Sequence, residues 1–174
     1  DHRQVEEWFA QFNATDDAAR KEQLAADVCK ALEVHAQIEE EIFYPAFVDA
    51  GGSPELHREA IAEHDAVRAQ VTKIRHSPGA AHDDHFDADV RELAAMVQHH
   101  VEEEEGRDGM FDQAASLDMD LDALGARLEH RKVQLMDDAS TDAGYDEAMR
   151  ESDEGQSLSP GLGDPDLPGG AARR

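Results

Sequence analysis

The sequence contains a single cysteine, Cys29, so the chain cannot form an internal disulfide. A lone thiol is typical of proteins in a reducing cytoplasm, and we expect a cytoplasmic protein. Positive charge is also scarce, because 16 lysines and arginines stand against 41 aspartates and glutamates and the net charge is −25. Phosphate groups and anionic lipids bind to clustered basic residues, so this composition argues against nucleic-acid partners and against membrane surfaces.

Long apolar runs and strand-like alternation are missing as well. No run approaches the roughly 20 apolar residues of a membrane span, and the first residues do not form an apolar signal segment. Hydrophobic residues make up 40% of the 174 residues, which is enough for one core but not for two. Apolar residues recur at helical spacing nearly everywhere, so the sequence predicts an all-α domain.

Five helices are expected from this pattern. The first helix is expected to end near Asn13. The second is expected from about Asp17 to Tyr44, the third from Ser53-Pro54 to just before Ser77, and the fourth from about Asp83 to Gly106. A shorter fifth helix is expected from about Asp120 to Met136. Pro45 and the glycines after it are expected to stop the second helix, and Ser53 to cap the third. Four long helices joined by short loops predict an antiparallel up-down-up-down four-helix bundle followed by a short fifth helix.

Beyond about Asp137 the apolar repeat ends, and aspartate, serine, glycine and proline are common. We therefore expect residues 1–136 to form the domain and residues 137–174 to form an acidic, disordered tail. Such a tail is a possible docking segment for a protein partner, although solvated disorder alone accounts for its composition.

A histidine and a glutamate four residues apart occur twice, as His35-x-x-x-Glu39 and His100-x-x-x-Glu104. Residues at this spacing project from one face of a helix. The apolar stripe of the fourth helix continues in the same rhythm onto the second pair, and the stripe of the second helix passes through the first pair. By the same phase, His99 and Glu103 point toward solvent, and Glu40 and Glu41 point away from the inward face.

His64 and His2 lie beside the apolar stripes of the third and first helices, so each of the four helices supplies one inward histidine. Buried carboxylates are costly unless they are paired or bind a metal ion. Two His–Glu pairs that simply hydrogen-bond each other are the alternative, but two such pairs on facing helices favour a metal site. His57 is a weaker inward candidate.

These residues resemble the hemerythrin-like, HHE cation-binding family over about residues 1–136. The matching segments are Asp1-His2, His35-x-x-x-Glu39 with the following Glu40-Glu41-Ile42-Phe43-Tyr44-Pro45, Glu63-His64-Asp65, and His99-His100-Val101-Glu102-Glu103-Glu104-Glu105. The resemblance implies a four-helix bundle that holds a non-haem di-iron centre with an oxo or hydroxo bridge. It also implies the metal ligands, which we call the six-ligand set: His2, His35, Glu39, His64, His100 and Glu104.

The sequence departs from the oxygen-carrying members of that family at Arg68, where they have a fifth histidine, and in placing Glu104 four residues after His100 rather than five. Both features match the branch with four histidines and two glutamates. Arg68 is expected at the surface or near the open side of the centre. Tyr44 is expected either to pack in the core or to lie close enough to Glu39 to influence redox chemistry.

Two six-coordinate irons offer about twelve positions, and the six-ligand set with a bridge fills about ten of them. The open positions predict a protein that binds or reacts with oxygen, peroxide or nitric oxide, for sensing, detoxification or iron handling. A non-catalytic iron or oxygen sensor that acts through a protein partner is the alternative, and a metal-free helical interaction module is a third. Imidazole and carboxylate also suit manganese or zinc. The sequence leaves enzymatic activity and oligomeric state undetermined.

Overall fold

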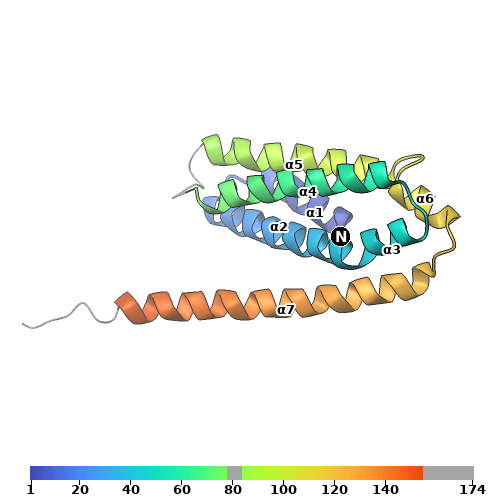
Figure 1. Ribbon diagram of the computed structural model, residues 1–174. Coiled ribbons are helices and arrows are strands. Elements are labelled where there is room, and N and C mark those ends of the chain that lie inside the picture. The colour runs from blue at the N-terminus through green and yellow to red at the C-terminus, as the bar shows by residue number, and fades with distance from the viewer. Residues whose placement is uncertain (78–83, 155–174) are drawn as a thin grey trace, which may run out of the picture. The chain divides into compact units, whose positions relative to one another are not determined.

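The computed structural model of the protein describes residues 1–77 and 84–154, with side chains as far as residue 137. Its regular elements are helices (Figure 1): α1 (His2–Ala14), α2 (Ala18–Ile38), the π-helix η1 (Glu39–Phe43), α3 (Tyr44–Asp49), α4 (Pro54–Arg75), α5 (Asp84–Glu105), α6 (Met110–Ser116) and α7 (Leu121–Glu154). The predicted all-α class is confirmed. Within the described ranges, none of the helices is both long and apolar enough to cross a membrane.

The chain divides into two units, Asp1–Asp137 and Asp138–Arg174. In the first unit α1 packs against α2 and α5, and α4 packs against the same two helices, which closes a four-helix bundle (Figure 1). The expected bundle is therefore confirmed. The first part of α7 belongs to this unit, and Arg131 and Lys132 form ion pairs with Glu41 and Asp1.

Most helix ends lie where turn chemistry predicts them. The Ser53 hydroxyl accepts hydrogen bonds from the backbone N–H groups of Glu55 and Leu56, so it caps α4 as expected. Asp17 caps α2 in the same way, with its carboxylate accepting from the N–H of Arg20. Capping satisfies donors that the first turn of a helix leaves free, which is why these short polar residues locate the helix starts.

Pro45 does not stop the second helix, so this expectation was wrong. The helix passes from α2 through the π-turn η1 into α3, and the backbone N–H of Tyr44 bonds to the carbonyl of Glu39, five residues earlier. A proline lacks an N–H and clashes inside a regular helix, but it is tolerated in a first turn. The π-turn restarts the helix just before Pro45, which places the proline in such a turn.

The end of the bundle also differs from expectation. The short helix α6 was not predicted, and α7 continues to Glu154 instead of ending near Met136. No proline occurs between Leu121 and Glu154, so the backbone can remain helical after the apolar repeat has stopped. The rest of the tail that we expected to be disordered, residues 155–174, lies outside the described residues.

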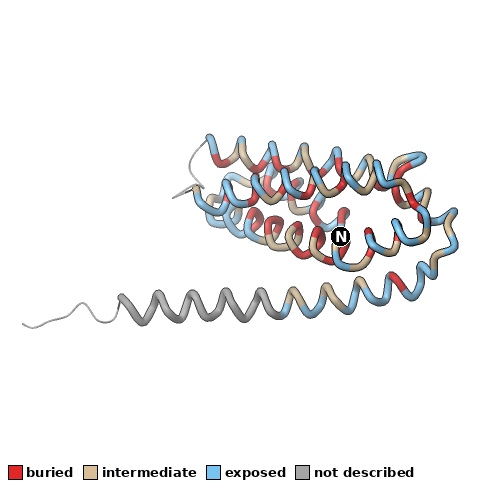
Figure 2. The backbone as a smooth tube through the Cα atoms, in the orientation of Figure 1, coloured by how far each residue is buried: buried red, intermediate tan, exposed pale blue. Residues whose placement is uncertain are grey.

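Two apolar clusters fill the interior of the first unit, and buried positions follow the facing sides of the helices (Figure 2). The larger cluster extends from Val5 on α1 to Val97 on α5. The smaller cluster lies at the other end of the bundle and includes Phe43, Phe47 and Met110. Between the two clusters lies a section of the bundle whose inward-facing residues belong to neither cluster.

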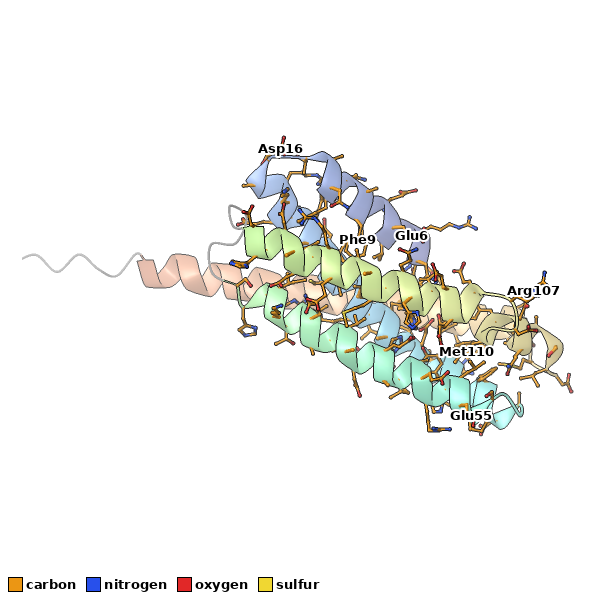
Figure 3. All side chains as sticks on the ribbon, turned by 90° about the horizontal axis from the view of Figure 1, so that it is seen from above. Glu6, Phe9, Asp16, Glu55, Arg107 and Met110 are labelled. Atoms are coloured by element: carbon orange, nitrogen blue, oxygen red, sulfur yellow. The ribbon has the colours of Figure 1, made fainter. Side chains whose placement is uncertain are left out.

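A tight connection between α5 and α6 closes the end with the smaller cluster. Arg107 and Met110 lie at the same end of the bundle as Glu55, which stands at the start of α4 (Figure 3). A Cβ atom on Gly109 would lie 2.5 Å from the carbonyl oxygen of Glu103, so only glycine fits this close approach. The connection therefore keeps the last turn of α5 against α6.

Candidate metal centre

A layer of polar side chains separates the two apolar clusters. Along α4, His64 follows Ala60 of the smaller cluster and precedes Val67 of the larger one. On α2 and α5 the chain runs the other way, from Leu32 and Val97 of the larger cluster to His35 and His100, so the helical phase that buries the apolar stripes also buries the polar layer. The layer is the six-ligand set, whose members are between 2% and 9% exposed: His2, His35, Glu39, His64, His100 and Glu104.

The four histidines direct their Nε2 atoms toward one another in two pairs. His2 Nε2 lies 3.3 Å from His35 Nε2, and His64 Nε2 lies 3.3 Å from His100 Nε2. The rings of His35 and His100 are also neighbours, with centroids 5.7 Å apart. Four helices therefore supply one imidazole each to a single volume, as the sequence predicts.

The two glutamates lie between these histidines. Glu39 Oε2 is 3.2 Å from His35 Nε2 and 3.5 Å from His64 Nε2. Glu104 Oε2 is 3.5 Å from His100 Nε2 and 3.7 Å from His2 Nε2. Each carboxylate thus contacts a histidine of its own helical segment and a histidine of another helix, which is the placement that a bridging ligand needs.

Tyr44 joins the two carboxylates. Its ring is fully buried, and its hydroxyl lies 3.1 Å from Glu39 Oε2 and 3.0 Å from Glu104 Oε1. The i+5 closure of η1 makes this possible, because in a regular α-helix a residue five positions on would point about 140° away from Glu39. Core packing alone does not describe Tyr44, since its hydroxyl is part of the polar layer.

Three further carboxylates hold the outer nitrogens of the histidines. The Nδ1 atoms of three histidines lie within hydrogen-bond distance of a glutamate on a different helical element: His2 with Glu105 at 2.7 Å, His64 with Glu40 at 3.0 Å, and His100 with Glu63 at 2.9 Å. An Nδ1–H that donates to a carboxylate leaves the Nε2 lone pair directed inward, which is the tautomer that binds a metal ion.

Glu40 lies off the inward face, as the helical phase predicts, but its carboxylate still reaches the site. Glu40 is not in the six-ligand set, but its Oε1 atom lies 3.0 Å from His64 Nδ1, and the same oxygen accepts a hydrogen bond from Arg68 Nη2 at 2.5 Å. Arg68 is partly exposed and also donates to Asp65. It lies at the surface, as one of the two alternatives held, and it fixes the carboxylate behind His64. His57 lies beside the Tyr44 ring, at 5.6 Å between centroids.

Burial and crowding set the charge of these groups. Burial, with the neighbouring histidines, lowers the pKa of His35 well below its ordinary value, and burial lowers the pKa of His64 to about 4. Burial raises the pKa of Glu104 to about 7, and burial together with the charge of Glu104 raises the pKa of Glu39. His35 and His64 are thus neutral near pH 7, which is the form that donates a lone pair to a metal.

The nitrogen and oxygen atoms of the six-ligand set are arranged better for binding metal ions than for hydrogen bonding to one another. Glu104 Oε2 is buried and lacks a hydrogen-bond partner among the described residues, although such an orphaned acceptor is costly. Contacts between donor atoms across the layer are 3.2 to 3.7 Å. Nitrogen and oxygen ligands at about 2.1 Å from a metal lie about 3.0 to 3.4 Å apart in octahedral or tetrahedral geometry.

The family model named "Hemerythrin HHE cation binding domain" matches residues 1–114, which is well over half of the chain. The chain belongs to this family. The resemblance drawn from the sequence is thereby confirmed for residues 1–114, and cation binding by histidine and glutamate is the property that the family name states. No solved structure matches the chain.

One curated relative of this HHE domain is named "DNA nickase" and comes from Nostoc sp. (strain PCC 7120 / SAG 25.82 / UTEX 2576). It is 32% identical over 108 residues, which cover 60% of this chain and 29% of the relative. The chain thus spans less than a third of that protein, and the shared region says nothing about what the remaining part does.

Proposed function

We propose that the six-ligand set holds two iron ions and that the protein binds or reacts with a small ligand, namely oxygen, peroxide or nitric oxide. The observation that carries this proposal is the buried layer of four imidazole nitrogens and two carboxylates in a family that binds cations. Two overlapping groups of donors support two ions rather than one: His2, His35, His100 and Glu104, and His35, Glu39, His64 and His100.

The enclosure of the layer favours a small ligand. Every member of the six-ligand set is less than a tenth exposed, and apolar clusters lie on both sides of it. An organic substrate would have to displace core side chains to reach these atoms, whereas a molecule of two non-hydrogen atoms would not. The buried position of the layer therefore restricts the ligand to a small molecule, and no residue that recognises a larger molecule is needed for this selection.

Residues around the layer would prepare it for this task. The Tyr44 hydroxyl is a fixed donor between Glu39 and Glu104, and burial with these two carboxylates raises its pKa, so it stays a neutral phenol. Glu40, Glu63 and Glu105 orient histidines through Nδ1. Bound iron would supply redox chemistry and open coordination positions.

Metal analysis and absorption spectra of the purified protein test this proposal. We expect about two irons per chain, with ligand-to-metal absorption in the near ultraviolet that changes on reduction. Glu104→Gln keeps the shape of the side chain and is expected to lose tightly held iron, whereas Glu102→Gln, an exposed neighbour on α5, is expected to keep it. A folded, colourless protein that takes up no iron contradicts the proposal, and tight manganese or zinc in its place corrects the metal.

The sensor hypothesis differs from the enzyme hypothesis in whether the bound small ligand is consumed. A protein that consumes peroxide when loaded with iron, and stops doing so as Glu104→Gln, acts as an enzyme. A loaded protein that changes its spectrum with oxygen or nitric oxide without consuming peroxide acts as a sensor, and a protein partner would then be sought with the α7 region and the acidic tail.

A further inference from the structure

In the part of the chain that the structure describes, one group of side chains of metal-ligating types lies near the surface outside the six-ligand set. It consists of Glu63 on α4 and of His99 and Glu103 on α5, and we call it the outer triad. One donor atom from each residue lies within 4.8 Å of the other two. We propose that the outer triad is a separate binding site for a divalent transition-metal ion, and that it captures metal from solvent beside the buried centre.

The distances fit a shared ion. His99 Nε2 is 3.5 Å from Glu63 Oε1 and 3.6 Å from Glu103 Oε1. Ligands at about 2.1 Å from a tetrahedral metal lie about 3.4 Å apart, which matches both contacts of His99, and the donor atoms of Glu63 and Glu103 lie within 4.8 Å of each other. The side chain of His99 is 66% exposed, that of Glu103 37% and that of Glu63 19%, which leaves room for water as the remaining ligands.

The charge around the outer triad favours a cation. In the part of the chain with described side chains, Glu63 and Glu103 form ion pairs with histidines and with no lysine or arginine. Glu40 and Glu41 are by contrast matched by Arg68 and Arg131. Glu103 also lies in the last turn of α5, where the free carbonyl groups add negative potential.

The donor types select the class of ion. Two carboxylates alone would suit magnesium or calcium, but an imidazole nitrogen favours zinc, iron(II), manganese and their neighbours. Glu63 also connects the two sites, because its Oε1 atom faces His99 while its Oε2 atom lies 2.9 Å from His100 Nδ1. An ion in the outer triad would therefore share a carboxylate with the residue that orients a proposed ligand of the buried centre.

Zinc titration of the metal-free full chain in about 0.15 M salt, followed by calorimetry, tests this proposal. We expect a tight class of sites and one weaker site per chain. His99→Ala and Glu103→Gln should each weaken only the weaker site, by at least about tenfold. Glu102→Gln removes the same charge from an exposed position on the same helix and should leave both classes unchanged.

The two proposals fail in different ways. Glu104→Gln should remove the tight class and keep the weaker site, so absence of a tight class in the unmodified protein refutes the buried centre alone. A weaker site that His99→Ala leaves intact, or that binds magnesium as well as zinc, is an ordinary acidic surface and overturns the outer triad.

Discussion

The Tyr44 hydroxyl is the most informative single group to remove, because its role depends on whether metal is bound. In the metal-free protein it is the donor that lies between Glu39 Oε2 and Glu104 Oε1, at 3.1 and 3.0 Å. Tyr44→Phe keeps the ring, which is fully buried, and leaves these two acceptors without that donor. A buried acceptor that loses its partner costs about 1–3 kcal/mol of folding free energy.

In the metal-loaded protein the same substitution should cost less than about 1 kcal/mol, because the ions then satisfy the carboxylate oxygens. The metal-free form of Tyr44→Phe should therefore unfold about 3–10 °C lower than the unmodified protein, and the loaded form only slightly lower. By linkage, a difference of about 1.4 kcal/mol between the two forms tightens metal binding by the folded variant about tenfold.

Thermal unfolding followed by circular dichroism at pH 8, with and without metal, measures both values. This pH lies above the value of about 7 to which burial raises the pKa of Glu104, so that carboxylate carries its charge. Phe47→Leu is the matched control, because Phe47 is equally buried in the same cluster. This substitution should destabilise the metal-free and the metal-loaded forms alike. If Tyr44→Phe lowers both transitions by the same amount, the hydroxyl is not a stand-in for metal and the reasoning fails.

Three further predictions concern a carboxylate beside the site, the connection between α5 and α6, and the larger apolar cluster. Glu40→Gln should weaken metal binding about 10- to 100-fold because it releases His64 Nδ1, whereas Glu41→Gln should not; equal affinities in a chelator competition would contradict this. Gly109→Ala should cost about 1–3 kcal/mol in chemical denaturation because its Cβ meets a carbonyl oxygen at 2.5 Å, while Gly125→Ala, with open space around it, should be neutral or stabilising; the reverse order would refute the close-approach argument. Cys29 is 1% exposed and burial raises its pKa to about 11, so thiol reagents at pH 8 should modify it only after unfolding, and rapid labelling of the folded protein would show that this end of the core opens.

Helical phase could identify the six-ligand set because the polar layer lies in register with the apolar stripes. On α5 the stripe that ends at Val97 continues onto His100 and Glu104, and the structure leaves His99 exposed. An inward-facing residue is a property of a single helix, so one sequence period is enough to find it. That these six residues are metal ligands stays a prediction.

The carboxylates behind the histidines could not be found in this way, because each of them belongs to a different element from its partner. Glu105 of α5 bonds to His2, and Glu63 of α4 bonds to His100. One signal was present in the sequence: each of these glutamates directly precedes or follows an inward residue. A rotation of about 100° from the inward direction points a side chain at the neighbouring helix, which is where the outer nitrogen of the next histidine lies.

The π-turn explains two further differences between sequence and structure, at Tyr44 and at Pro45. A period of 3.6 residues places Tyr44 off the face that carries Glu39, and it makes Pro45 a helix stop. One additional residue in the turn from Glu39 to Phe43 reverses both conclusions, because it brings the Tyr44 hydroxyl to Glu39 and starts a new first turn for the proline. Such insertions are costly in a regular helix and occur most often at functional sites. Glu39 is the first residue of the π-turn and Tyr44 directly follows it. The π-turn therefore accounts both for the irregular backbone and for the position of the Tyr44 hydroxyl between the carboxylates of Glu39 and Glu104.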